Sequence, residues 1–402
     1  MARTTKDFLQ EVDQYSAHNY HPLPVVLVKG EGCWVWDIEG NKYLDMLAAY
    51  SAVNQGHRHP KIIAALTEQA NKLTLTSRAF HNDQMGPFLR QLCEMSGFEQ
   101  ALLMNSGAEG VESALKAARR WGYRTKKIPQ DQAEIICCAN NFHGRTISVI
   151  SFSTEAAYRD GFGPFTPGFK VIPYNDTQAL TQAITKNTAA FLVEPIQGEG
   201  GVLIPRAGYL TEVQKICREN NILFIADEIQ TGLGRTGRLF ACEHEGVKPD
   251  MMIVGKALAG GCYPVSGILA NRALMDAAFV PGNHGSTFGG NPLGCALGRA
   301  ALQVIRDEKL VERSAELGTY FLGELKKITS PCIADVRGRG LMIGVEIKKE
   351  FGLARPYCER LKDEGMLCKE THDQVVRFSP PLIIEKSTID WALERIRKVL
   401  TA

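Results

Sequence analysis

The 402-residue chain predicts an α/β fold with a mostly parallel central sheet, joined to a second, smaller α+β domain. Three observations support this expectation. Short apolar runs recur through the middle of the chain, stretches with helical spacing separate them, and after about residue 295 the pattern changes to long helices around a pair of strands. Alternating strands and helices are typical of a parallel sheet with helices on its faces, and a chain of this length folds into about two or three domains.

The apolar runs are short and lack regular alternation, as is typical of strands covered on both faces. Between two of them, residues 209–220 place Leu210, Val213, Ile216 and Cys217 at helical spacing. The runs therefore predict strands at residues 101–104, 134–138, 189–193, 222–226, 251–254 and 265–269.

The two ends of the chain predict the smaller domain. A helical pattern covers residues 300–328, a glycine-interrupted strand pair covers 333–347, and terminal helices are expected near 355–364 and 388–400. Residues 33–43 favour a short hairpin. We expect residues 51–295 to form the large domain, 296–402 the small domain, and the segment 1–50 to pack with the small domain.

Composition and charge exclude several classes of partner. Lys and Arg number 46 and Asp and Glu 44, giving a formal net charge of +2 with no like-charged tail for nucleic acid or membrane. Neither a signal peptide nor a membrane span of roughly 18 apolar residues is found. The 11 cysteines are scattered without a CxxC pair, which favours reduced thiols and a cytoplasmic location. His57 and His59, before Pro60, are interpreted as turn residues, so no metal site is expected.

Polar residues end five of the predicted strands, at positions where an α/β sheet binds its ligands. Because the carboxyl ends of parallel strands meet at one edge, these residues predict a single site. They are found in the segments 105–109, 141–145, 194–199, 227–230 and 255–256.

The segment after the first of these strands predicts a helix start that binds phosphate. Ser106 can cap a helix and Glu109 can complete a capping box. Such a start presents free N–H groups and a positive dipole, and Gly107 lets a ligand approach the backbone. An ordinary helix cap is the alternative interpretation.

Asp227 and Lys256 are the candidate chemical groups. They lie 256 − 227 = 29 residues apart, about one strand–helix–strand unit, which predicts that they end neighbouring strands. A carboxylate at that depth needs a partner, and a pyridinium N–H would be one. Burial beside cationic neighbours can make the Lys256 amine a nucleophile. For either residue alone, a structural salt bridge is the competing explanation.

A glycine pattern at residues 232–237 spells GxGxxG but does not predict dinucleotide binding. The residues that follow it lack a clean helical pattern, and no second strand ends in an acid about 20 residues later.

Together these residues resemble the class III aminotransferases of fold type I, which use pyridoxal 5'-phosphate (PLP), and the match runs over nearly the whole chain. The resemblance implies a homodimer in which Thr287, in Gly-Ser-Thr-Phe-Gly-Gly-Asn-Pro, reaches the neighbouring subunit's cofactor. It also assigns roles to the strand-end residues: Ser106, Gly107 and Ala108 to the phosphate loop, Phe142 to the ring that stacks on the cofactor, Asp227 to the partner of the pyridine nitrogen, Gln230 to the phenolic oxygen, and Lys256 to the covalent link.

Within the class, the segments 18–24, 49–57, 73–80 and 193–199 are most similar to the ornithine aminotransferases. This likeness implies that Tyr20 and Arg145 hold the α-amino and α-carboxylate groups of ornithine and that Tyr50 shapes the pocket. It implies that Glu199 pairs with Arg377 during the ornithine half-reaction and releases it for the oxo acid. Glu194, in the same segment, is assigned to the substrate site.

The implied reaction transfers the δ-amino group of L-ornithine to 2-oxoglutarate, giving L-glutamate 5-semialdehyde and L-glutamate, a step of arginine breakdown or proline synthesis. Lys256 would be both tether and general base, and Asp227 would keep the ring nitrogen protonated. An N-acetylornithine or 4-aminobutyrate aminotransferase shares every cofactor residue, and Tyr20 and Tyr50 are the discriminators. His143, where some members carry an aromatic residue, leaves specificity open.

Two further alternatives are less favoured. A racemase or mutase on the same scaffold would not need the pairing of Glu199 with Arg377. A non-catalytic ligand-binding protein would not need Lys256.

Overall fold

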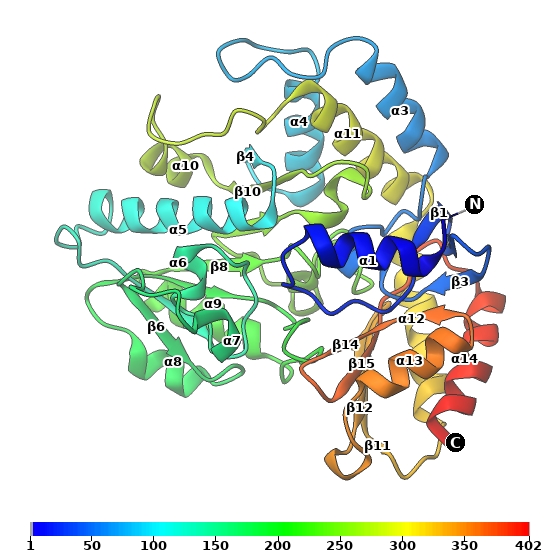
Figure 1. Ribbon diagram of the computed structural model, residues 1–402. Coiled ribbons are helices and arrows are strands. Elements are labelled where there is room, and N and C mark those ends of the chain that lie inside the picture. The colour runs from blue at the N-terminus through cyan, green and yellow to red at the C-terminus, as the bar shows by residue number, and fades with distance from the viewer. Residues whose placement is uncertain (1–2, 402) are drawn as a thin grey trace.

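The computed structural model describes residues 3–401, which form three sheets and their covering helices (Figure 1). The large sheet has seven strands in the order β4-β10-β9-β8-β7-β5-β6. Neighbours from β9 to β6 run parallel, whereas β10 runs against both β9 and β4. The strands are β4 (Gln100–Met104), β5 (Glu134–Cys138), β6 (Phe169–Ile172), β7 (Thr188–Val193), β8 (Leu223–Asp227), β9 (Met251–Val254) and β10 (Ser266–Ala270).

The predicted mostly parallel α/β sheet is therefore confirmed, and each of the predicted strands is present within about one residue of its expected bounds. Strand β6 was not predicted. It is an edge strand, paired only with β5, and Lys170 interrupts its apolar character. An edge strand needs no continuous apolar run, because one side of it faces no other strand.

Helices cover both faces of the large sheet. Helix α5 (Gly107–Arg124) packs on one face in a core with β5, β7 and β9. Helices α8 (Thr177–Ala183) and α9 (Tyr209–Glu219) pack on the other. The connecting helices are α2 (Ala48–Ser51), α3 (Pro60–Ala70), α4 (Met85–Ser96), α6 (Ile147–Ile150), α7 (Ala156–Arg159) and α10 (Arg272–Ala278), with 3-10 turns η1 (Ala241–Glu245) and η2 (Lys256–Ala259).

The ends of the chain build two smaller sheets. One has the order β1-β2-β3-β13 and the other β11-β12-β15-β14. The predicted hairpin is confirmed as β2 and β3, and the C-terminal β13 pairs parallel to β3. The strands are β1 (Leu27–Glu31), β2 (Trp34–Asp37), β3 (Lys42–Asp45), β11 (Ile333–Arg339), β12 (Met342–Ile347), β13 (Met366–Leu367), β14 (Lys369–Thr371) and β15 (Val375–Phe378).

The helical pattern over residues 300–328 belongs to two helices, α11 (Pro292–Asp307) and α12 (Leu310–Lys326). Lys309 separates them, because its φ of 51° is left-handed and cannot continue a right-handed helix. Both helices bury apolar residues in one core, so the pattern runs on across the break. The remaining helices are α1 (Thr5–Tyr15), α13 (Arg355–Asp363) and α14 (Lys386–Thr401), with the 3-10 turn η3 (Lys349–Phe351).

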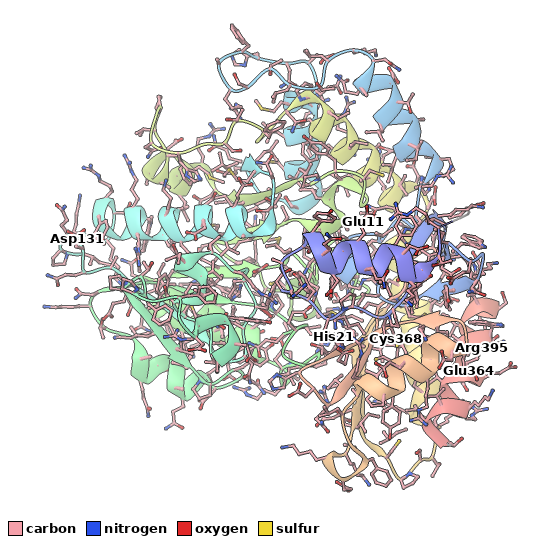
Figure 2. All side chains as sticks on the ribbon, in the orientation of Figure 1. Glu11, His21, Asp131, Glu364, Cys368 and Arg395 are labelled. Carbon is pink, nitrogen blue, oxygen red and sulfur yellow. The ribbon has the colours of Figure 1, made fainter. Side chains whose placement is uncertain are left out.

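The segment after α1 is held against the small part of the molecule near His21 (Figure 2). Arg355 donates hydrogen bonds to the carbonyls of His21 and Pro22, each at 3.1 Å. Tyr20, the residue before this anchored segment, is 68% exposed. The backbone pairing and these bonds agree with packing of the N-terminal segment on the small domain, although the domain boundaries themselves stay a prediction.

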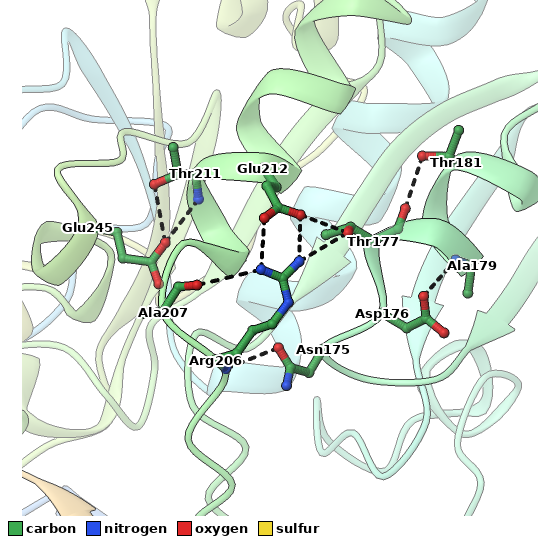
Figure 3. A network of polar contacts seen from close by, with 10 residues as sticks. All are labelled: Asn175, Asp176, Thr177, Ala179, Thr181, Arg206, Ala207, Thr211, Glu212 and Glu245. Atoms are coloured by element: carbon green, nitrogen blue, oxygen red, sulfur yellow. Dashed lines mark hydrogen bonds and ion pairs between the residues drawn. The ribbon is translucent and has the colours of Figure 1, made fainter.

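A polar network joins the starts of α8 and α9 (Figure 3). Arg206 donates to both oxygens of Glu212 and, at 3.1 Å, to Thr177. Asp176 caps α8 by accepting the N–H of Ala179 at 2.8 Å. The residues of this network are exposed or half-buried, so the network fixes two loops and contributes little stability. Among residues 3–401, no helix is long and apolar enough to cross a membrane.

Candidate active site

Asp227 and Lys256 enter one cavity at the carboxyl ends of neighbouring parallel strands. Asp227 ends β8, Lys256 follows β9, and the two strands pair along their length. The cavity holds about 200 Å³. Its lining comes from the ends of the strands that the sequence singled out: Gly107, Ala108, Phe142, His143, Gly144, Glu194, Ile196, Glu199, Asp227, Ile229, Gln230, Thr231 and Lys256.

The Lys256 amine is buried among carboxylates. Burial lowers its pKa below the ordinary value, although Glu199 and Asp227 oppose that shift. Its φ of 46° is left-handed, a conformation that costs an ordinary residue about 1–2 kcal/mol. Strained backbone of this kind is concentrated at functional sites. A lowered pKa increases the fraction of neutral amine, which is the form of lysine that attacks a carbonyl carbon.

Asp227 is held in position by two hydrogen bonds. Its Oδ1 accepts the N–H of Ile229 at 3.0 Å, and its Oδ2 lies 2.6 Å from Nδ1 of His143. Burial lowers the pKa of His143, but the hydrogen bond and charge of Asp227 more than offset this, so its pKa is raised. The sequence analysis missed this pair, because the two residues lie 84 positions apart and no spacing rule connects them.

Glu194, which follows β7, is a buried carboxyl beside this pair. Desolvation raises its pKa to about 8, with the Asp227 charge adding to the effect and His143 opposing it. Its Oε1 accepts the N–H of Phe142 at 2.7 Å. Glu194 therefore carries a proton at neutral pH and holds the loop that bears Phe142 and His143.

We expect Glu194→Gln to stabilise the protein in a pH-dependent way. The raised pKa means that the folded state binds a proton which the unfolded state has lost, so this group's contribution falls as pH rises from about 4.5 to about 8. Gln keeps the hydrogen bond and has no charge to bury. The difference in unfolding free energy should be near zero at pH 4, grow by up to roughly 1.4 kcal/mol per pH unit, and level off above pH 8. Urea unfolding of both proteins measures it, and a constant difference would contradict the burial of an ionisable Glu194.

The start of α5 forms the predicted capping box. The N–H of Glu109 donates to Oγ of Ser106 at 3.2 Å, and the Glu109 carboxylate accepts the N–H of Ser106 at 2.9 Å. The first N–H groups of a helix have no partner within the helix. Those of Gly107 and Ala108 border the cavity, so this end of it could bind phosphate.

Glu199 and Arg377 form an ion pair at one end of the cavity. Arg377 lies on β15 and is 1% exposed, and its Nη1 donates to Oε1 of Glu199 at 2.5 Å. Burial would raise the pKa of Glu199, but Arg377 and Lys256 lower it to about 2. Gln230 also donates to Glu199, at 3.0 Å. The charge of Arg377 is thus masked by a side chain that itself lines the cavity.

Side chains of the sheet β11-β12-β15-β14 hold the backbone that carries Glu199. Oγ1 of Thr371 donates to the carbonyl of Glu199 at 2.6 Å. Arg337 donates to the carbonyl of Gly201 at 2.6 Å and to that of Val202 at 3.1 Å. These bonds hold the backbone at and after Glu199, whereas the Glu199 side chain contacts Arg377 and Gln230.

A left-handed turn places Tyr50 against Arg377. Residues 48–51 have φ values between 47° and 71°, each unfavourable for a side-chain-bearing residue. Asp45 stabilises the turn by accepting the N–H of Ala48 at 2.8 Å, and His57 contacts its other oxygen at 2.7 Å. The Tyr50 ring lies 5.0 Å from the Arg377 guanidinium. Contacts from Asp45 thus stabilise a strained turn that places Tyr50 beside Arg377.

Arg145 lies near the rings of Tyr20 and Phe142. The guanidinium of Arg145 is 5.8 Å from the rings of Tyr20 and Phe142. Arg145 is exposed and forms no ion pair with any residue from 3 to 401. The structure thus provides one masked and one open arginine at the same site.

Six of the predicted site residues do not line the cavity in this chain: Ser106, Tyr20, Tyr50, Arg145, Arg377 and Thr287. Five of them adjoin the lining directly or through one another, whereas Thr287 is exposed on a separate loop. Its loop is tied to the start of α5, because Asn105 donates to Ser286 at 2.7 Å. Within the described residues, no group of three or more His, Cys, Asp or Glu side chains could hold a metal ion.

Known proteins share this architecture. The family model "Aminotransferase class-III" matches residues 15–400. The chain belongs to the class III aminotransferases. Ornithine aminotransferase from Bacillus subtilis is 61% identical to this aminotransferase over 396 residues, 98% of each chain, and that from Geobacillus is 61% identical over 99% of each.

Solved structures agree with the family. Ornithine aminotransferase from Toxoplasma gondii, crystallised with partial occupancy of PLP at its active site, has a TM-score of 0.97 at 49% identity, covering 99% of this aminotransferase and 94% of that chain. Acetylornithine aminotransferase from Elizabethkingia anophelis has a TM-score of 0.90 at 48% identity, covering 99% of each chain.

The cofactor of this class is PLP, and the cavity of this aminotransferase suits it. The phosphate requires N–H donors and a positive field, which the start of α5 provides. The ring nitrogen requires a buried carboxylate, and Asp227 is 4% exposed. The aldehyde carbon requires an amine with a lowered pKa, which Lys256 carries. The chemistry of the donor set therefore fits the cofactor.

Proposed function

We propose that this aminotransferase is an ornithine δ-aminotransferase, which moves the δ-amino group of L-ornithine to 2-oxoglutarate. The observation that carries the proposal is the contrast between its two arginines. Arg145 is open, whereas Arg377 is neutralised by Glu199 at 2.5 Å with the Tyr50 ring beside it. A site of this kind binds a substrate with one carboxylate and also one with two.

The cofactor would be held by the residues around the cavity. The N–H groups of Gly107 and Ala108, with Ser106 capping the helix, would bind its phosphate. Phe142 would stack on the ring, Asp227 would pair with the ring nitrogen and Gln230 would face the phenolic oxygen. When bound, PLP supplies an electron sink for the carbon–hydrogen bond that is broken.

In the amine half-reaction, Arg145 would bind the α-carboxylate of ornithine and Tyr20 its α-amino group. The δ-amine then points inward to Lys256. Because Glu199 masks Arg377, the inner end of the pocket presents no free cation to the incoming amine. Nζ of Lys256 would take the proton from the δ-carbon as a general base. The δ-amino nitrogen would stay with the cofactor, and water would supply the aldehyde oxygen of the glutamate 5-semialdehyde that leaves.

In the second half-reaction, 2-oxoglutarate brings a carboxylate to each end. Arg145 would bind the distal carboxylate and Arg377 the α-carboxylate, each through a planar fork of N–H donors. Glu199 must release Arg377 for this, so the ion pair acts as a switch between the two substrates. The nitrogen kept from ornithine would pass to the α-carbon of the oxo acid, whose oxygen would leave as water, and Lys256 would deliver the proton to that carbon to give glutamate.

Assembly and location follow from the same proposal. The exposed loop that carries Thr287 would reach the cofactor of a second copy of the chain, giving a homodimer. All 11 cysteines are free thiols, which supports a location in the reducing cytoplasm.

A substrate panel tests the proposal. The purified enzyme is assayed with ornithine, N-acetylornithine and 4-aminobutyrate, each against 2-oxoglutarate. We expect the highest kcat/KM for ornithine. A higher value for N-acetylornithine would instead place this chain with the Elizabethkingia enzyme, which it resembles at 48% identity.

We expect Tyr50→Ile to shift preference from ornithine towards 4-aminobutyrate. Tyr50 packs on Arg377 at 5.0 Å and narrows the inner pocket, and its loss gives a carboxylate better access to that arginine. The ratio of the two kcat/KM values should change by at least about tenfold, equivalent to roughly 1.4 kcal/mol. Tyr320→Ile, far from the site, is the control. Unchanged selectivity would contradict the role of Tyr50.

A further inference from the structure

Arg145 rests on an aromatic ring that neither the sequence motif nor the cavity lining includes. The ring of Tyr158, on α7, lies 4.2 Å from the Arg145 guanidinium. Its hydroxyl accepts a hydrogen bond from Nη2 of Arg145 at 3.2 Å. Tyr158 also meets Phe142 edge to face, with centroids 6.2 Å apart. One tyrosine thus contacts both the open arginine and the ring proposed to stack on the cofactor.

Helix α7 is anchored to the protein by Arg159. Nη1 of Arg159 donates to the carbonyls of Ile150, Ser151 and Ser153, at 3.1, 2.7 and 3.3 Å. Its guanidinium lies 4.0 Å from the Phe165 ring. Tyr158 is half-buried, whereas Arg145 is exposed. The tyrosine therefore lies on an anchored helix, beside an arginine that is exposed.

The type of support affects how Arg145 can be used. A free arginine side chain loses much rotamer freedom when it binds a carboxylate, so prior orientation strengthens binding. An acidic partner would orient it but would also compete with the substrate. An aromatic face and a hydroxyl acceptor orient the guanidinium without neutralising it. Arg377 has the opposite arrangement, since Glu199 neutralises it.

We propose that Tyr158 is a positioning residue that orients Arg145 towards the substrate carboxylate in both half-reactions. The proposal rests on the function proposed above. It assigns to Tyr158 a share of the affinity for ornithine and for 2-oxoglutarate, and no share in the chemical step at Lys256.

Two substitutions separate the hydroxyl from the ring. Tyr158→Phe removes one hydrogen bond and should raise KM for ornithine and 2-oxoglutarate about 2- to 10-fold. Tyr158→Leu removes the ring as well and should raise both about 10- to 50-fold. In both variants kcat should stay within about twofold, and the visible spectrum of the bound cofactor should not change.

Control variants and a second amine exclude a merely structural role. Tyr320 is a matched tyrosine, because its ring lies 4.1 Å from the Lys386 amine and its hydroxyl donates to Asp390, far from the cavity. Tyr320→Phe and Tyr320→Leu should leave KM unchanged. With 1,4-diaminobutane, which has no carboxylate, Tyr158→Leu should have no effect on the amine half-reaction. In an Arg145→Met background, Tyr158→Leu should add less than about twofold.

Calorimetric titration with glutarate, an unreactive dicarboxylate, keeps this test separate from the proposed function. Tyr158→Leu should raise its Kd about 10- to 50-fold even if ornithine proves not to be the substrate. An unchanged Kd would overturn the role of Tyr158. A fall in kcat with an altered visible spectrum and unchanged KM would also overturn it, and would indicate that Tyr158 acts through Phe142.

Discussion

Lys256→Ala should lower the rate of transamination by more than about 10⁴-fold, the upper end of what one positioned acid–base group supplies. Lys256 enters the cavity with a pKa lowered by burial, and it is the one lysine that lines the cavity among residues 3–401. The variant loses the amine that binds the cofactor covalently and the base that moves the proton. Its visible absorption band should disappear with its activity.

Two controls test whether the loss of activity comes from the missing Lys256 amine. Lys170→Ala removes a partly exposed lysine paired with Glu134 at 2.9 Å and should leave activity unchanged. Small primary amines added to the Lys256→Ala enzyme should restore part of the rate, because they replace the missing base. Appreciable turnover by the variant without added amine would refute the assignment of Lys256.

Asp227→Asn should reduce kcat about 10²- to 10³-fold, the loss typical when a preorganised electrostatic partner is removed. Asn keeps the shape of the side chain but cannot hold a proton on the ring nitrogen through charge. The pKa of His143 should fall at the same time, because burial remains while the carboxylate that raises it is gone.

Steady-state assays and NMR titration of His143 measure these two effects, with Asp390→Asn on the exposed face of α14 as the control. A variant with full activity would show that Asp227 is not the partner of the ring nitrogen. A fall in kcat without a change at His143 would show that the two side chains are not coupled in solution.

Local patterns in the sequence were sufficient for most strands of the large sheet and for the strand-end residues, but not for the edge strand β6. Asp227 and Lys256 follow apolar runs one strand–helix–strand unit apart, and parallel pairing brings such residues together. The capping box of Ser106 and Glu109 joins residues only three positions apart, so it is visible without a structure. The homodimer, the substrate and the residue roles came from the family resemblance.

Contacts between distant segments could not be predicted in this way. Tyr158 supports Arg145 from 13 residues away, across a loop whose path has no sequence signature. The left-handed turn at residues 48–51 contains no glycine, so the sequence gives no sign of it. Contacts from Asp45 offset the strain of this turn. Pairing of His143 with Asp227 depends on the loop after β5, which brings His143 to the end of β8.

The hydrogen bonds from the sheet β11-β12-β15-β14 to the backbone around Glu199 affect how fast the catalytic cycle can run. With that backbone fixed by Thr371 and Arg337, the proposed exchange of one substrate for the other would need a rotation of the Glu199 side chain and no hinge motion. Because Arg377 is 1% exposed, this rotation must break a buried ion pair and would be slower than the picosecond-to-nanosecond rotations of exposed side chains. Domain hinge motions take microseconds to milliseconds, so alternating between an amino acid with one carboxylate and an oxo acid with two would avoid the slower kind of motion.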